Sequence, residues 1–139
     1  MRVSKKIKVA GPKPNRKSWV INQLRSISMR WPPRNKIYKQ NRREIPRYKK
    51  DGTLYKKPAF EHMCTLCKGW FPTKQICMDH INPVVDLEGM SHLSDEEYIG
   101  KFVVQLLCYE DNWQKICHKC HDIKTENENK ARNINKKLD

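Results

Sequence analysis

A helix near the N-terminus is predicted from the spacing of apolar residues between about Ser18 and Arg30. These residues recur on one helical face and are Trp19, Val20, Leu24 and Ile27. Ser18 can cap the helix, and Pro32-Pro33 is expected to end it. Arg25 and Arg30 would then lie toward the other side, where they are available to phosphate groups, although the helix could equally serve only to pack on the rest of the fold.

A second helix is predicted after Ser94-Asp-Glu-Glu97, which matches a capping box, and it should run to about Leu107. Its apolar residues lie at helical spacing and are Tyr98, Phe102, Val103 and Leu106. We expect this helix to contribute to the core. A third helix should begin at Cys120-His121 and continue to about Asn129, and the Asn- and Lys-rich residues after Asn127 are expected to fray.

A short strand is predicted over Gln75–Met78, continued by Asp79-His80-Ile81 and broken by Pro83. The preceding segment, residues 69–74, has the composition of a turn. Neighbouring residues on a strand point to opposite faces of the sheet. A twist or bulge is therefore required if Asp79 and His80 are to serve one site.

The segment 34–50 is densely basic, with Tyr38 and Tyr48 interleaved. Its cationic groups can neutralise a nucleic-acid backbone while the tyrosine rings stack on bases or lie on sugars. Asp51-Gly52 follows Tyr48-Lys-Lys and precedes Thr53-Leu-Tyr55, which indicates a hairpin with a two-residue turn. Residues 1–14 mix Lys with Gly and Pro and are predicted to have no fixed structure on their own.

The charge is unevenly distributed along the 139 residues. Residues 1–60 carry 19 basic and 2 acidic residues (net +17), and residues 61–139 carry 10 and 13 (net −3), which together give the total of +14. This asymmetry predicts a basic DNA-binding extension over residues 1–59 and a near-neutral domain over residues 60–139. The alternatives are a solvated tail and, less in keeping with the pattern, a membrane-surface segment. The predicted DNA contacts are Arg25, Arg30, Arg34, Lys36, Arg42, Arg43, Arg47, Lys49, Lys50 and, outside the extension, Lys124.

Hydropathy and cysteine content bear on the compartment. No apolar run approaches the 18 residues of a membrane-spanning helix, and no apolar segment of a secretory signal follows the basic N-terminus. Six cysteines in such a chain favour metal binding over disulfides. We therefore expect a reducing, cytoplasmic location.

Four of the cysteines form two pairs with zinc-ligand spacing, and they are Cys64, Cys67, Cys117 and Cys120. Four thiolates make a closed tetrahedral site, which suits a structural zinc ion that ties distant segments together. The alternatives are a redox Cys-x2-Cys motif and thiols that are buried by chance, and the presence of two such pairs flanking Asp79-His80 argues against both. Cys77 and Cys108 lack a close partner and are expected to be small core residues.

A second group of polar residues lies between and beside the cysteine pairs, and its members are Asp79, His80, Asn112 and His121. His121 follows a predicted zinc ligand directly, so the zinc site would hold its backbone in place. Lys124 and Thr125, one helical turn further on, can reach a phosphate. His62, His92 and His118 are expected to lie outside this group.

The order Cys-x2-Cys, Asp-His-Ile-x-Pro and Asn-x-Gln-x-x-Cys-x2-Cys-His-x2-Lys-Thr resembles the HNH endonucleases. The resemblance covers roughly residues 60–130 and implies an α+β fold, a small zinc-stapled ββα-metal domain. The basic, partly helical N-terminal extension lies outside the resemblance. Small proteins of this type with a basic flank resemble nucleases of phages or mobile elements, for which the compartment would be the host cytoplasm. The segment 84–111 is longer than the Gly-containing loop of compact family members.

The resemblance also implies roles for the four polar residues. His80 resembles the general base that deprotonates the attacking water, and Asn112 resembles the central Asn that braces the loop bearing that base. Asp79 and His121 resemble the ligands of a catalytic divalent cation, Mg2+ or a similar ion. The implied reaction is hydrolysis of DNA to 5′-phosphate and 3′-hydroxyl products. The alternatives are a non-catalytic zinc-stabilised module that binds nucleic acid or protein, and a nuclease that cleaves RNA or a particular DNA structure.

Overall fold

The structure is a computed structural model that describes residues 11–138. Residues 1–10 and 139 lie outside the described residues, and so does most of the segment 1–14 that was predicted to lack fixed structure. The described chain is α+β, as predicted, with four α-helices and two small antiparallel sheets. In chain order the elements are α1 (Arg16–Ser28), α2 (Pro32–Lys39), β1 (Arg42–Ile45), β2 (Ala59–Met63), β3 (Trp70–Pro72), the 3-10 helix η1 (Thr73–Gln75), β4 (Ile76–His80), α3 (Asp95–Leu106), the 3-10 helix η2 (Glu110–Asn112), β5 (Trp113–Cys117) and α4 (His118–Leu138).

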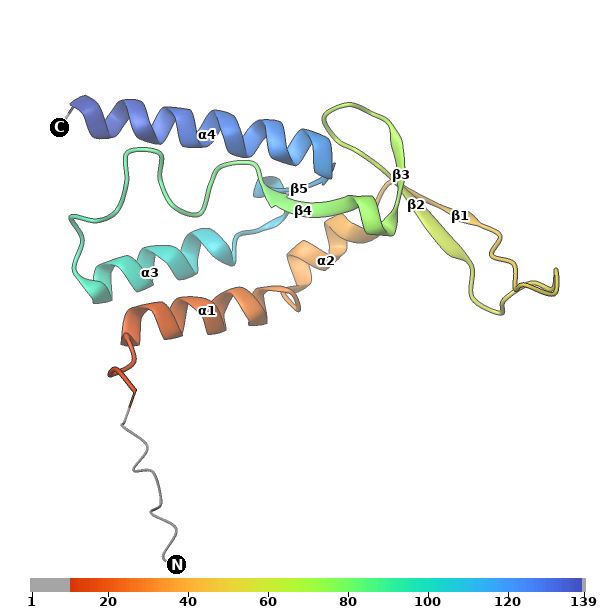
Figure 1. Ribbon diagram of the computed structural model, residues 1–139, viewed down its shortest axis with the longest axis horizontal. Coiled ribbons are helices and arrows are strands. Elements are labelled where there is room, and N and C mark those ends of the chain that lie inside the picture. The colour runs from red at the N-terminus through yellow and green to blue at the C-terminus, as the bar shows by residue number, and fades with distance from the viewer. Residues whose placement is uncertain (1–10, 139) are drawn as a thin grey trace, which may run out of the picture.

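The β4–β5 ribbon lies at the centre, between α4 on one side and the α1–α3 pair on the other (Figure 1). Helix α2 packs against β5, while the β1–β2–β3 sheet projects from the body. The boundary predicted between residues 59 and 60 falls at the start of β2, which pairs with β1. The basic extension and the cysteine-bearing segment therefore share a sheet.

The pairing of the strands fixes which side chains share a face. Strands β4 and β5 pair from Ile76↔Cys117 to His80↔Trp113 in a continuous antiparallel register. In the other sheet β2 lies between β1 and β3. Strand β3 falls within residues 69–74, so the turn prediction there was wrong for Trp70–Pro72. Pairing with β2, which local composition does not reveal, makes this segment extended.

The first helix begins earlier than predicted, because Asn15 and not Ser18 is its cap. The Asn15 side chain accepts a hydrogen bond of 3.0 Å from the backbone N–H of Ser18. The Pro32-Pro33 pair does not simply end this helix but begins α2, a helix that the sequence analysis missed. Proline suits the first turn of a helix, where its missing N–H would have no intrahelical partner.

The caps and lengths of the later helices agree in part with the predictions. Helix α3 begins after Ser94, whose hydroxyl accepts from the Glu97 N–H at 3.2 Å, as the capping box predicts. Helix α4 is longer than predicted and continues to Leu138 instead of fraying after Asn127. Arg132 and Asn135 donate from this last part of α4 to carbonyl groups of the 84–94 loop, which supports the added turns.

The small core contains an unusual polar pair on β5 and β2. Lys115 is 3% exposed, and its Nζ donates to His62 Nδ1 at 3.0 Å and to the carbonyls of Tyr38 and Gln40 at the end of α2. His62 is fully buried and contacts Thr73 Oγ1 through Nε2 at 3.1 Å. Burial, with Lys115 and Arg42 adding to it, lowers the pKa of His62 to about 4. Burial likewise lowers the pKa of Lys115 to about 8.

None of the helices in the described part of the chain combines the length and the apolar composition needed to cross a bilayer.

Candidate metal centre and polar cluster

The four predicted zinc ligands come together between β2 and the β5–α4 junction. The sulfur atoms of Cys64, Cys67, Cys117 and Cys120 all lie within 4.8 Å of one another. A zinc ion with Zn–S bonds of about 2.3 Å holds its sulfurs about 3.8 Å apart, so a small contraction completes a tetrahedron. Four soft donors with no open position fit a structural zinc ion.

The backbone around the cysteines prepares the sulfurs for a cation. Burial raises the pKa of the Cys64 thiol, but N–H groups of Cys67, Cys117 and Leu66 point at its sulfur and bring the pKa to about 6. One of these contacts, from the Cys67 N–H, measures 3.4 Å. The neighbouring sulfur atoms, Cys117 foremost, raise the pKa of Cys120 to about 12. The four sulfurs thus compete for protons that a cation would replace.

The remaining cysteines are half-buried, in keeping with the prediction that they are packing residues. Cys77 packs against the cluster around Ile116, and burial raises its pKa to about 11. The Cys108 carbonyl accepts hydrogen bonds from the indole N–H groups of Trp31 and Trp113, at 2.6 and 3.0 Å. His92 and His118 are exposed, as expected.

Asp79 and His121 are brought together at the interface of β4 and α4. His121 Nε2 lies 3.7 Å from Asp79 Oδ1, and the Asp79 side chain is 14% exposed. His121 occupies the first turn of α4, directly after the ligand Cys120, so the cysteine cluster fixes the start of its helix. A carboxylate oxygen and an imidazole nitrogen at this separation can serve as two neighbouring ligands of one divalent cation.

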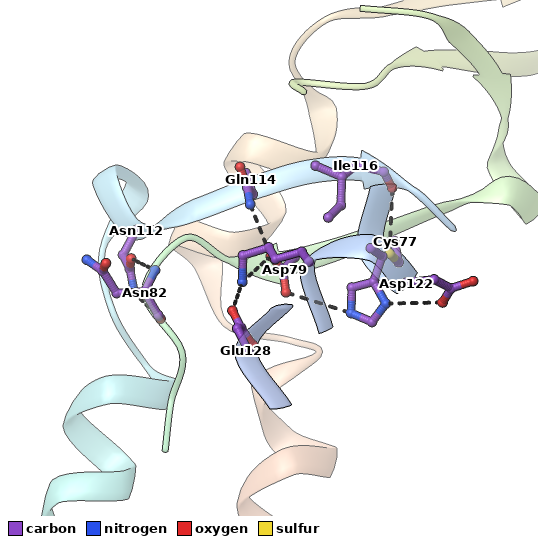
Figure 2. A network of polar contacts seen from close by, with 10 residues as sticks. Cys77, Asp79, Asn82, Asn112, Gln114, Ile116, Asp122 and Glu128 are labelled. Atoms are coloured by element: carbon purple, nitrogen blue, oxygen red, sulfur yellow. Dashed lines mark hydrogen bonds and ion pairs between the residues drawn. The ribbon is translucent and has the colours of Figure 1, made fainter. Parts of the chain in front are cut away.

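The second oxygen of Asp79 already has cationic and amide partners (Figure 2). Gln114, directly opposite on β5, donates to Asp79 Oδ2 at 3.0 Å, and Lys124 Nζ lies 3.1 Å from the same oxygen. Lys124 also pairs with Glu128 one turn further along α4. Lys124, predicted to contact phosphate, thus lies between two carboxylates and reaches a phosphate only by giving up these pairs.

Asn112 makes paired hydrogen bonds with the backbone just after β4. Its Oδ1 accepts from the Asn82 N–H at 2.8 Å, and its Nδ2 donates to the Asn82 carbonyl at 3.2 Å (Figure 2). The Asn112 carbonyl also accepts from the Ile81 N–H at 2.9 Å. These bonds hold the segment that follows His80 against the start of β5, in spite of the long insert between Asn82 and Asn112.

His80 is oriented by contacts on the α3 side of the ribbon. Its Nε2 lies 2.9 Å from the Leu106 carbonyl oxygen, and its ring centroid lies 3.9 Å from that of Trp113. A carbonyl oxygen only accepts, so Nε2 carries the hydrogen and the Nδ1 lone pair of the neutral ring is left to accept a proton. Burial lowers the pKa of His80, while the Leu106 carbonyl and Asp79 act in the opposite direction.

The continuous β4–β5 register separates the side chains of Asp79 and His80. Asp79 pairs with Gln114 on the α4 face, and His80 pairs with Trp113 on the opposite face. The twist or bulge expected for a shared site does not interrupt this register. The structure therefore joins Asp79 with His121 and Asn112 with Asn82, and directs the His80 ring elsewhere.

Two grooves open on either side of the strand end. One, of about 640 Å³, follows α4 and is lined by Ile81, Gln114, Lys124 and Glu128 among others. The other, of about 830 Å³, lies on the α3 side and includes Asn82 and Asn112. Consecutive residues Ile81 and Asn82 thus face different grooves, and neither groove is lined by Asp79, His80 or His121.

The residues predicted to contact DNA occupy three different settings. Arg25, Arg30 and Lys50 are exposed, although the Arg25 guanidinium lies 5.5 Å from the Phe102 ring. Three others take part in packing or ion pairs: Arg34 with Met29, Asn35 and Trp113, Lys36 with Glu110, and Arg43 with Glu61 and Trp70. Arg42, Arg47 and Lys49 lie over aromatic rings of the β1–β2 hairpin.

Sequence reasoning missed Gln114 and Glu128, the polar partners that surround Asp79 and Lys124. The alternation of residues along a strand pairs Gln114 with Asp79 once the β4–β5 register is known, and Glu128 lies four residues after Lys124 on a helix. The helical spacing could have been recognised in the sequence, whereas the register depends on tertiary structure.

Comparisons with protein-family models, with curated proteins and with solved structures returned no match to this chain.

Proposed function

We propose that this protein is a metal-dependent DNA endonuclease of the HNH type. The observation that carries the proposal is the pairing of Asp79 Oδ1 with His121 Nε2 at 3.7 Å, directly beside a cluster of four cysteines. A divalent cation on these two ligands would supply a Lewis acid for a phosphodiester. The Asn112 bonds to Asn82 support the proposal, because they match the bracing role that the HNH resemblance implies.

In this proposal His80 accepts the proton of the attacking water at Nδ1. The bond from Nε2 to the Leu106 carbonyl selects the tautomer in which Nδ1 is unprotonated, and burial lowers the pKa so that the ring is neutral near pH 7. Because His80 and Asp79 lie on opposite faces of the ribbon, this mechanism requires the phosphate to lie at the end of β4, within reach of both side chains. Lys124 lines the groove along α4 and can exchange its carboxylate partners for the phosphate.

A nicking assay tests this function. Supercoiled plasmid is incubated with the protein and Mg2+ or Mn2+, and the same assay is run with His80→Ala, Asp79→Asn and, as a matched control, the exposed His92→Ala. We expect nicking by the wild type and by the control, and a loss of at least about 100-fold in His80→Ala. Equal nicking by wild type and His80→Ala, or none by either with several ions and DNA forms, would refute the proposal.

A zinc-stabilised module that binds nucleic acid without cleaving it is the second candidate. Two observations favour it: the His80 ring faces away from Asp79, and Lys124 already balances the Asp79 charge. This function predicts salt-sensitive DNA binding that His80→Ala leaves unchanged, with no nicked product. End-mapping of any cleaved DNA, which should carry 5′-phosphates and 3′-hydroxyls, distinguishes the endonuclease from a contaminating activity.

A further inference from the structure

The end of the β1–β2 hairpin, residues 46–58, is a projecting ribbon that we call the hairpin tip. Every residue of the tip is exposed, and the hairpin extends away from the helices and from the β4–β5 ribbon (Figure 1). Backbone hydrogen bonds join Lys49 to Thr53 at 2.7 Å and Tyr55 to Arg47 at 2.8 Å. The tip is thus a two-stranded ribbon that contributes no buried residue to the core.

The turn of the tip is held by its own polar groups. Gly52 has a φ of +88°, and its N–H bonds to the Lys49 carbonyl, which closes a three-residue loop instead of the predicted two-residue turn. Asp51 Oδ1 accepts from the Thr53 N–H at 2.9 Å and from the Thr53 hydroxyl at 2.6 Å, and these bonds lower its pKa. The single carboxylate of the tip is therefore engaged within the turn.

The two faces of the tip differ. The Arg47 guanidinium lies 4.2 Å and Lys49 Nζ lies 5.6 Å from the centre of the Tyr55 ring, so one face presents two cations over an aromatic ring. Tyr48 and Leu54 pair with each other on the opposite face, where they are 61% and 58% exposed. Stacking on an aromatic ring orders a long basic side chain while its outward N–H groups stay free to donate.

The charge of the tip is strongly positive, with five basic residues and one acidic residue in residues 46–58. Clustered cations on a projecting surface bind a polyanion with the release of counterions. In the helical part of the extension, Arg34 and Lys36 are engaged in packing and in an ion pair, while Arg25 and Arg30 are exposed. The hairpin tip presents a projecting cationic surface, and none of its basic residues forms an ion pair with another described residue.

We propose that the hairpin tip enters the major groove of duplex DNA, with Arg47 and Lys49 on the flanking phosphates and the Tyr48–Leu54 face toward the base edges. A two-stranded ribbon fits the major groove of B-form DNA, which is about 12 Å wide, whereas that of A-form RNA is too deep and narrow. This binding surface is separate from the Asp79–His121 cluster and does not depend on cleavage.

Fluorescence anisotropy with a labelled duplex of about 25 base pairs, without added divalent ions, tests the proposal. The full chain is compared with Arg47→Gln/Lys49→Gln and with Lys136→Gln/Lys137→Gln, a control of equal charge change at exposed positions near the end of α4. Two lost phosphate contacts should weaken binding about 10- to 60-fold near 0.1 M salt and lower the slope of log Kd against log salt by about 1.8. The charge-conserving Arg47→Lys/Lys49→Arg variant should retain most of the affinity.

Several results would overturn the proposal. An unchanged affinity and salt slope in Arg47→Gln/Lys49→Gln, or an equal loss in the Lys136/Lys137 control, would show that the tip makes no special contact. Binding of duplex RNA or of single strands with equal affinity and equal sensitivity to the variant would exclude the groove geometry. Undiminished binding to a duplex whose major groove is filled by glucosyl groups carried on cytosine C5 would also exclude the groove geometry. Binding is measured without divalent ions and so does not depend on cleavage, and failure of the nuclease proposal leaves this result unaffected.

Discussion

Replacing Lys115 with Met removes the cation that joins α2, β2 and β5. The lysine is 3% exposed and donates to three acceptors, namely His62 Nδ1 and the carbonyls of Tyr38 and Gln40. Those carbonyls belong to the end of α2, where a positive charge also interacts favourably with the helix dipole. Met has similar length and can fill the space, but it donates no hydrogen bond.

The expected loss follows from these three contacts. Each buried acceptor left without a donor costs about 1 kcal/mol or more, which gives about 3 kcal/mol in total. The burial of the apolar Met side chain and the absence of a buried charge offset about 1 kcal/mol of this loss. We therefore expect Lys115→Met to lower the free energy of unfolding by about 2 kcal/mol at pH 7. Lys36→Met, at an exposed position of α2, breaks an ion pair of 3.5 Å with Glu110 and should cost less than about 1 kcal/mol.

The same substitution should alter the dependence of stability on pH. His62 has a pKa of about 4 in the folded protein, below its ordinary 6.5, because of burial and then the charges of Lys115 and Arg42. Between these values the unfolded chain binds more protons, so stability falls by up to about 3 kcal/mol as pH drops from 6.5 to 4. Removal of Lys115 raises the folded-state pKa of His62. The difference in stability between wild type and variant should therefore shrink toward pH 4.

Urea unfolding at a fixed free zinc concentration, followed by tryptophan fluorescence, measures both effects. Zinc must be buffered because the four-cysteine cluster links metal binding to folding. A loss in Lys115→Met no larger than in Lys36→Met would refute the assignment of a structural role to the buried ammonium. A difference between wild type and Lys115→Met that stays constant from pH 7 to pH 4 would refute its coupling to His62.

Three further predictions concern other parts of the molecule. Cys117→Ser should lose zinc binding and ordered structure, whereas Cys77→Ser should keep both, as measured by metal analysis and near-UV circular dichroism. Retention of one zinc ion per chain by Cys117→Ser would contradict the assignment of the four cysteines as zinc ligands. Ser94→Ala should lower the free energy of unfolding by about 1 kcal/mol through loss of the α3 cap, and an unchanged urea midpoint would count against this. Lys124→Met should tighten Mn2+ binding about tenfold in titrations, because it removes a competing cation 3.1 Å from Asp79, and weaker binding would show that Lys124 supports the cation site.

Features set by local chemistry could be predicted from the sequence. The cysteine spacing located a cluster whose sulfurs converge, and Ser94 and Asp51-Gly52 marked a helix start and a turn. Helix α2 was missed because Pro32-Pro33 was interpreted only as a stop, although proline also starts helices. The buried position of Lys115 could not be predicted, since its acceptors at Tyr38 and Gln40 lie 77 and 75 residues away in the chain.

In the polar cluster around Asp79, too, some contacts could be predicted from the sequence and others could not. The sequence placed Asp79 near His121 and Asn112 near the end of β4, and the structure contains both contacts. A shared site for Asp79 and His80 was expected to need a twist or bulge, whereas the structure keeps the two side chains on opposite faces of the ribbon. The engagement of Lys124 by Asp79 and Glu128 was not foreseen, because it needs β4 and α4 to be packed together.

The paired amide bonds between Asn82 and Asn112 join the two ends of the intervening segment. Its two ends meet at a fixed point, so a change in the length of the segment does not by itself separate the end of β4 from the start of β5. Closure entropy grows only with the logarithm of length, about 0.6 kcal/mol per doubling, so large changes in size are tolerated. Helix α3 within this segment supplies the carbonyl that orients His80, so an exchange of the segment would change the setting of that ring while the strand ends stay joined.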